Sequence, residues 1–115
     1  MKVMSKTRYV IHSTCFDKRG RVISSATNSY VDSVALMRYY AVKSGNPHKV
    51  FNHSEIAAID KALKARKDIH RLVIIRYDSQ GRLKESKPCP VCSYAIEDIG
   101  IKEVYYSTPE GMKKL

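Results

Sequence analysis

The pattern of apolar and polar positions divides the chain into short β-type runs and longer amphipathic stretches, which predicts an α/β fold. Residues 9–16 and 21–26 are rich in β-branched and aromatic side chains, and the turn at 17–20 between them predicts a β-hairpin. Apolar residues recur at helical spacing further along, as at Ile56, Ile59 and Leu63. The predicted elements are strands 9–16 and 21–26, helices 32–44 and 53–67, strand 72–75, helix 88–99 and strand 102–107.

The order of these elements predicts a mixed sheet. The continuous apolar run at 72–75 is typical of a central strand that is covered on both faces. A helix joins it to strand 102–107, which implies parallel pairing through a right-handed crossover, while the hairpin supplies the antiparallel part. We therefore expect a single domain over residues 1–115, an α/β sandwich of two or three layers.

The charge of the chain limits the class of its partners. The 21 Lys and Arg residues outnumber the 11 Asp and Glu residues, which gives a formal net charge of +10. Such a charge favours an anionic partner, which is a nucleotide phosphate, a nucleic acid or an acidic protein. The basic residues are spread along the chain, however, so an ordinary solvated surface explains them equally well.

Cysteine usage and hydropathy indicate a reducing compartment. No apolar run approaches the roughly 20 residues of a membrane span, and residues 1–6 contain no apolar stretch that could act as a signal peptide. Cys89 and Cys92 form a Cys-x-x-Cys pair, and the third cysteine, Cys15, stands apart. This pattern is typical of metal binding or redox chemistry rather than of a disulfide framework. We expect a cytoplasmic protein with no membrane partner.

Two segments carry the candidate chemistry, and each stands at the start of a predicted helix. Glu55 follows His53 by two residues, and Cys92 follows Cys89 by three. One imidazole and two thiolates are good zinc ligands, and three protein ligands leave the fourth tetrahedral position for water. The positive end of a helix favours thiolate over thiol. Glu55 is then close to the metal without binding it, and can move protons between water and a substrate.

At these residues the chain resembles the cytidine/deoxycytidylate deaminase superfamily, whose signature joins His-x-Glu to Pro-Cys-x-x-Cys. The similar segments are residues 53–58, 87–92 and 101–108. The resemblance implies a three-layer α/β/α sandwich with a mixed sheet and a Zn²⁺ cofactor held by His53, Cys89 and Cys92. It also implies that Glu55 moves protons while water attacks C4 of a cytosine ring and ammonia leaves.

The resemblance extends to the substrate. Asn28 follows the second hairpin strand, as does an asparagine that contacts sugar or base in many members of the family. Ser54 and Pro88, which lie within the two motifs, are further candidate substrate-binding residues. The favoured substrate is dCMP, since the basic charge suits a phosphate. Compact deaminases encoded by phages have much the same plan, which allows a viral origin and a location in host cytoplasm.

Three alternatives stay open. A structural zinc site needs a fourth ligand, for which only Cys15 and His48 are at hand, and neither has motif spacing. The enzyme could instead act on a base within single-stranded DNA or RNA, or the chain could be a non-catalytic zinc-binding module. Because the predicted core is minimal, we also expect a homo-oligomer in which a second copy covers an exposed sheet face or edge.

Overall fold

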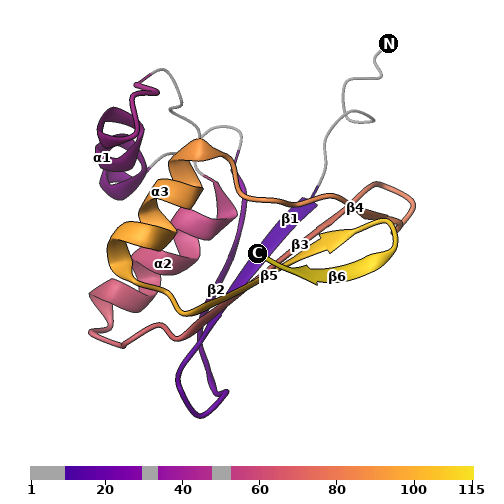
Figure 1. Ribbon diagram of the computed structural model, residues 1–115, viewed down its shortest axis with the longest axis horizontal. Coiled ribbons are helices and arrows are strands. Elements are labelled where there is room, and N and C mark those ends of the chain that lie inside the picture. Colours follow the sequence, from indigo (N-terminus) through magenta and orange to yellow (C-terminus); the bar gives the residue numbers. More distant parts are fainter. Residues whose placement is uncertain (1–9, 30–33, 48–52) are drawn as a thin grey trace.

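In the computed structural model, which describes residues 10–29, 34–47 and 53–115, a mixed six-stranded sheet lies beside three helices (Figure 1). In chain order the elements are β1 (Val10–Phe16), β2 (Val22–Thr27), α1 (Ala35–Lys43), α2 (Ser54–Lys64), β3 (Arg71–Tyr77), β4 (Leu83–Lys84), α3 (Pro90–Ile99), β5 (Glu103–Thr108) and β6 (Gly111–Lys114). The predicted α/β sandwich around a mixed sheet is confirmed.

Strand pairing follows the predicted hairpin and crossover. β1 pairs antiparallel with β2 and with β3, and β3 pairs parallel with β5. The sheet order is β2-β1-β3-β5-β6, and β4 pairs with β3. The sequence pattern predicts neither β4 nor β6, because β4 has two residues and β6 shows no alternation of apolar side chains.

The described helices all lie on one side of the sheet (Figure 1). α2 packs on β1, β2 and β3, while α1 packs on α2 and α3. The core cluster that joins helices and sheet includes Ala58 and Ile59 of α2, Ile96 of α3 and the strand residues Cys15, Leu72 and Ile74. Of the two- and three-layer arrangements, the described residues therefore show helices on one face only.

The opposite face of the sheet has a mixed, half-buried surface. Register and side-chain alternation place His12, Thr14, Val73, Ile75 and Tyr105 on this face. All five are only partly exposed, and no helix of the described residues covers them. This face is therefore the largest part of the sheet without a helical partner in the described chain.

The inserted helix α1 supports the two segments that carry the candidate chemistry. Its buried Met37 and Tyr40 belong to a second cluster with Ile56 of α2 and with Val91 and Cys92 of α3. The Tyr40 hydroxyl also donates a hydrogen bond of 2.9 Å to a carboxylate of α3, that of Asp98. The start of this predicted helix at residue 32 lies outside the described residues, and its observed N-cap is Val34.

Helix boundaries differ from the predictions for local reasons. α2 ends at Lys64 rather than at residue 67, because Arg66 takes a left-handed conformation with φ of +57°. The Lys67 N–H then bonds to the Ala62 carbonyl, which is a Schellman-type helix end. α3 begins at Pro90 rather than at residue 88, because the residue before it is extended.

Two turns of the sheet have the same side-chain cap. In the β1–β2 turn, Asp17 Oδ1 accepts hydrogen bonds from the backbone N–H groups of Arg19 and Arg21, both at 2.9 Å. In the β3–β4 turn, Asp78 Oδ1 accepts the equivalent bonds two and four residues on, at 2.9 and 3.0 Å. Each turn closes on a glycine with positive φ. None of the helices in the described ranges is long and apolar enough to cross a membrane.

Candidate metal centre

The two candidate metal segments each begin a helix. His53 is the N-cap of α2 and Cys89 is the N-cap of α3, and both have extended backbone angles. Pro90 takes the first helical position of α3, where its fixed φ is already helical. N-caps are usually Ser, Thr, Asp or Asn, whose oxygen satisfies a free N–H group. An imidazole and a thiol occupy these positions here, so both helix starts carry metal-binding donors in place of a capping oxygen.

The three predicted ligands converge although they are far apart in the chain. His53 Nδ1 lies 3.3 Å from Cys92 Sγ and 3.4 Å from Cys89 Sγ. The three ligand atoms lie within 4.8 Å of one another, and no fourth His, Cys, Asp or Glu of the described residues joins the group. A tetrahedral zinc with its usual bond lengths separates nitrogen and sulfur ligands by about 3.6 Å. The donor set and its spacing therefore fit zinc with one open position.

The two thiols of this group differ in acidity. Hydrogen bonds from the Cys92 thiol and from His53 lower the pKa of Cys89 to about 3. The same bond to Cys89, together with burial, raises the pKa of Cys92. Cys89 is therefore the sulfur that is held as a thiolate. Because zinc ligation requires both sulfurs as thiolates, metal binding at this group releases a proton.

Glu55 stands in the first turn of α2, beside this group. Its side chain is buried, with 6 % of its surface exposed. Burial raises the pKa of the Glu55 carboxyl, and the hydrogen bond from Ser54 only partly opposes this. A carboxyl whose pKa is shifted towards neutrality can accept and return a proton at physiological pH.

Ser54 connects Glu55 to the sheet. Its Oγ lies 2.7 Å from the Ser13 Oγ of β1 and donates to Glu55 Oε1 at 3.1 Å. Ser13 and Ser54 are both fully buried. The role of Ser54 as a substrate contact stays a prediction, and the observed bonds give its hydroxyl a structural task as well.

Asn28 lies at the same end of the sheet as the metal group. α2 begins beside Ser13, and its Ala58 carbonyl accepts a bond from Ser24, so the helix runs towards the β1–β2 turn. Its start and the end of β2 therefore share one sheet end. Asn28 Oδ1 accepts a bond of 3.0 Å from the Ile11 N–H, which fixes the side chain against β1. A substrate contact by Asn28 stays a prediction.

Pro88 is buried directly before Cys89, and its carbonyl accepts a bond from Ser93 Oγ at 3.4 Å. Its predicted contact with substrate is likewise not decided by these bonds. The two alternative ligands are not part of the metal group. Cys15 is buried in the core of the sheet, where burial raises the pKa of its thiol, and His48 lies outside the described residues.

Sequence reasoning did not single out the serines that anchor the second metal segment. The Ser86 hydroxyl donates to the Ile74 carbonyl at 2.8 Å and accepts from the Ser107 N–H at 2.8 Å. The Ser86 N–H in turn bonds to the Ser107 carbonyl. Single serines give no sequence signal of this kind, because their partners are set by the assembled sheet. Ser13 was missed for the same reason.

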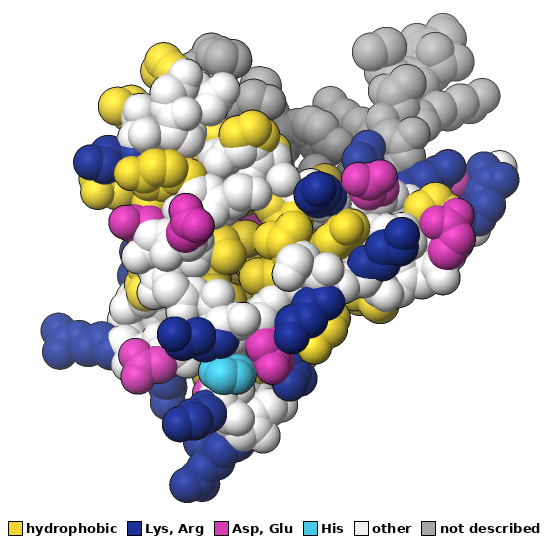
Figure 2. Space-filling model, viewed as in Figure 1, with side chains coloured by type: hydrophobic (Ala, Val, Ile, Leu, Met, Phe, Trp, Pro, Cys, Tyr) yellow, Lys and Arg dark blue, Asp and Glu magenta, His cyan; other side chains and the backbone are white. Residues whose placement is uncertain are grey.

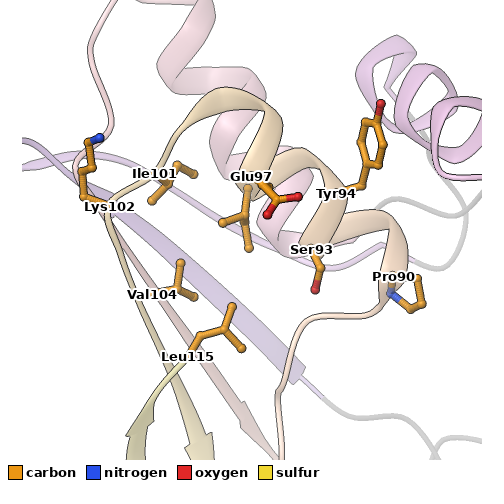
Figure 3. A pocket seen from close by; sticks show the side chains of 9 residues that line it. Pro90, Ser93, Tyr94, Glu97, Ile101, Lys102, Val104 and Leu115 are labelled. Atoms are coloured by element: carbon orange, nitrogen blue, oxygen red, sulfur yellow. The ribbon is translucent and has the colours of Figure 1, made fainter.

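A separate apolar groove lies along the outer side of α3, with a volume of about 630 Å³ (Figure 3). Its walls include Tyr94 and Ile96 of α3 and Val104 of β5, and Leu115 lies at its end. None of the predicted site residues lines this groove. It is therefore distinct from the metal group.

Comparison with protein families gives a match over most of the chain. The model for the cytidine and deoxycytidylate deaminase zinc-binding region matches residues 5–108, which include both metal segments. A comparison with curated protein sequences finds no match.

Among solved structures, the fold is similar to that of a glutamate-to-glutamine mutant of the cytidine deaminase from Mycobacterium tuberculosis. The two chains are 15 % identical, with a TM-score of 0.53, and the alignment covers 94 % of this chain and 74 % of the other. At this identity the likeness concerns the fold.

Proposed function

This chain belongs to the family of cytidine and deoxycytidylate deaminases with a zinc-binding region, and on that premise we propose that it hydrolyses the amino group from a cytosine ring. Cytosine and water would give uracil and ammonia. The proposed substrate is a free nucleotide or nucleoside, with dCMP favoured because a net charge of +10 attracts a phosphate.

One observation carries this proposal, namely the convergence of three zinc donors beside a buried carboxyl. His53, Cys89 and Cys92 would hold the metal, and their ligand atoms lie within 4.8 Å of one another. When bound, zinc supplies a Lewis acid that activates water at neutral pH. Three protein donors leave room for such chemistry, whereas a purely structural site would fill all four positions.

Glu55 is the proposed proton carrier. Its buried carboxyl would take a proton from the attacking water and deliver protons to ring atom N3 and to the departing amine. The raised pKa of Glu55 supports this role, because the carboxyl must both accept and release a proton during each turnover. The hydrogen bond from Ser54 holds one oxygen of this carboxyl in a fixed direction.

The decisive experiment is an assay of ammonia release with zinc-loaded protein. Cytidine, deoxycytidine, CMP, dCMP, adenosine, guanine and a cytosine-containing oligonucleotide form the panel. We expect turnover of dCMP above all others. Preference for the oligonucleotide would favour base editing within a nucleic acid, and inactivity of the zinc-loaded protein on the whole panel would favour a non-catalytic module.

A Glu55→Gln variant tests the mechanism. It should retain zinc, since Glu55 is not a ligand, and lose about 10²–10⁴-fold in kcat, the usual contribution of a general acid–base group. Glu97→Gln, an exposed change on α3, is the matched control and should leave kcat unchanged. Full activity of the Glu55→Gln variant would contradict the proposal.

We further propose a homo-oligomer. The sheet face that carries Val73, Ile75 and Tyr105 has no helical cover in the described chain, and a second copy would bury it. Sedimentation of wild-type protein and of a Val73→Lys variant should show a larger species only for the former. A cytoplasmic location and a viral source stay predictions from the sequence.

A further inference from the structure

A basic groove lies at the end of the molecule opposite the metal centre. The β1–β2 turn and the segment between α2 and β3 enclose it, with a volume of about 330 Å³. Its lining residues are Asp17, Lys18, Arg19, Arg21, Arg66, Lys67 and Asp68. Figure 2 shows Lys and Arg side chains gathered around this lower end of the molecule. α2 has 11 residues, so its length of about 16 Å separates the groove from the metal group.

Most of the charge in this groove is uncompensated. Arg21 is paired with Asp17 at 2.9 Å, and the same carboxylate caps its own turn. Lys18, Arg19, Arg66 and Lys67 are exposed and form no ion pair within the described part of the chain. Four cations thus face one groove with a single uncommitted carboxylate, that of Asp68. Only an anionic partner relieves the mutual repulsion of these groups.

Arg66 gives an independent indication. It is the one non-glycine residue with positive φ in the described chain, at +57°. It occupies the position after a helix end where glycine is normally found, because a side chain is strained there. A strained residue at a surface position favours a functional reason for its side chain. Here that side chain is a guanidinium that lines the groove.

The chemistry of the lining defines the ligand. The groove contains three arginines and two lysines, and neither an aromatic nor an aliphatic side chain lines it. A base needs a flat apolar or aromatic surface for stacking, so this groove has nothing to hold one. Guanidinium groups match phosphate oxygens in geometry, and a row of phosphates suits several separate cations better than one carboxylate does.

We propose that the basic groove binds the sugar–phosphate backbone of a nucleic acid, without reading its bases, at a site separate from the metal centre. Binding there requires no deamination, and a free nucleotide can occupy the metal centre at the same time. The proposal therefore stands apart from the proposed enzymatic function, and either can fail without the other.

The first test measures binding of a labelled oligothymidylate by fluorescence anisotropy at several salt concentrations. The variant Arg19→Gln/Lys67→Gln removes two groove cations, and Lys43→Gln/Lys113→Gln removes two exposed cations elsewhere. The groove variant should lower the slope of log K against log salt by about 1.4, which is about 0.7 for each single-strand phosphate contact. The control variant should keep the wild-type slope. Equal losses in both variants, or no binding by the wild type, would overturn the proposal.

The second test separates phosphates from bases. An abasic oligonucleotide of the same length should bind within about threefold of oligothymidylate, because the groove makes phosphate contacts only. Polyglutamate should not displace either one. A strong preference for the base-containing strand, or equal binding of polyglutamate, would contradict a phosphate-backbone site.

The third test uses the strained residue. Arg66→Gly should raise the urea midpoint of unfolding, because glycine adopts positive φ without strain, and should weaken oligothymidylate binding. Arg66→Lys keeps the charge and the strain, so it should retain binding without a gain in stability. An Arg66→Gly variant that binds as well as wild type would contradict the role of this side chain. Deamination of free dCMP should be the same in all groove variants.

Discussion

The carboxylates of the two sheet turns and the carboxyl of the metal centre are placed in opposite ways. Asp17 and Asp78 are held by backbone N–H groups, which lower the pKa of each side chain. Glu55 is removed from water, and burial raises its pKa. The turn residues stabilise the fold through their charge, whereas the charge of Glu55 is unfavourable where it stands. The difference shows that the chain retains a destabilising group at one place, which is the place where its chemistry is proposed.

The largest expected effect comes from removing a metal ligand. Cys92→Ala should weaken zinc binding by more than about 100-fold, since even changes behind a ligand cost about 10–100-fold. Deaminase activity should fall to background. Zinc content after dialysis, measured by mass spectrometry, gives the result.

Cys15→Ala is the matched control for this change, because it also removes a fully buried thiol. It should cost some stability through the cavity left in the core and yet retain zinc. If both cysteine variants keep zinc equally well, the assignment of Cys92 as a ligand is wrong.

The next effect concerns the anchor of the second metal segment. Ser86→Ala leaves the Ile74 carbonyl and the Ser107 N–H without their hydroxyl partner inside the protein. Unfolding by urea should show a loss of about 2 kcal/mol, the usual cost of buried unsatisfied groups. Ser93→Ala, which removes only a long bond of 3.4 Å, should change stability by less than about 0.5 kcal/mol. Equal effects would remove the special role of Ser86.

A smaller effect, of opposite sign, is expected at Glu55. A carboxyl with raised folded-state pKa favours folding while it is protonated, and this contribution is lost as the pH rises above the unfolded value. Zinc-free Glu55→Gln protein should therefore be more stable than zinc-free wild type at pH 7, and the difference should shrink in acid. Urea titrations at both pH values provide the measurement, and a less stable variant at pH 7 would refute the contrast drawn above.

The smallest effect is expected at the turns. The lowered pKa values of Asp17 and Asp78 mean that their stabilisation is present above the unfolded value of 3.8 and is lost as the pH falls through the folded value. Asp17→Asn/Asp78→Asn should slightly lower the melting temperature at pH 7 and flatten its fall in acid. Asp68→Asn, an exposed change outside both caps, should leave the acid profile as it is.

Local sequence signals predicted the hairpin, the central strand and the metal segments well. Gly20 and the aspartate before it mark their turn without help from the rest of the chain, and Pro90 marks a helix start in the same way. The convergence of His53 with Cys92 follows from two helix starts on either side of one parallel strand pair. Such features depend on spacing, which a sequence records directly.

Features that depend on assembled neighbours were beyond this reasoning. The partners of Ser13 and Ser86 lie on strands that are distant in the chain, and β4 exists only because two residues reach the edge of β3. The end of α2 at Arg66 runs against residue preference, since an arginine takes a position that favours glycine. The substrate contacts of Asn28 and Pro88 remain predictions, because they concern a molecule that the fold alone does not define.

The separation of the ligands along the chain has a consequence for biosynthesis. His53 and Cys89 are 36 residues apart, and β3 and α3 lie between α2 and β5. A ribosome therefore completes the whole first half of the domain before any cysteine that can share an ion with the histidine has been made. Metal acquisition has to be a late step, and a truncated translation product would leave the ribosome with its imidazole but without a way to retain zinc.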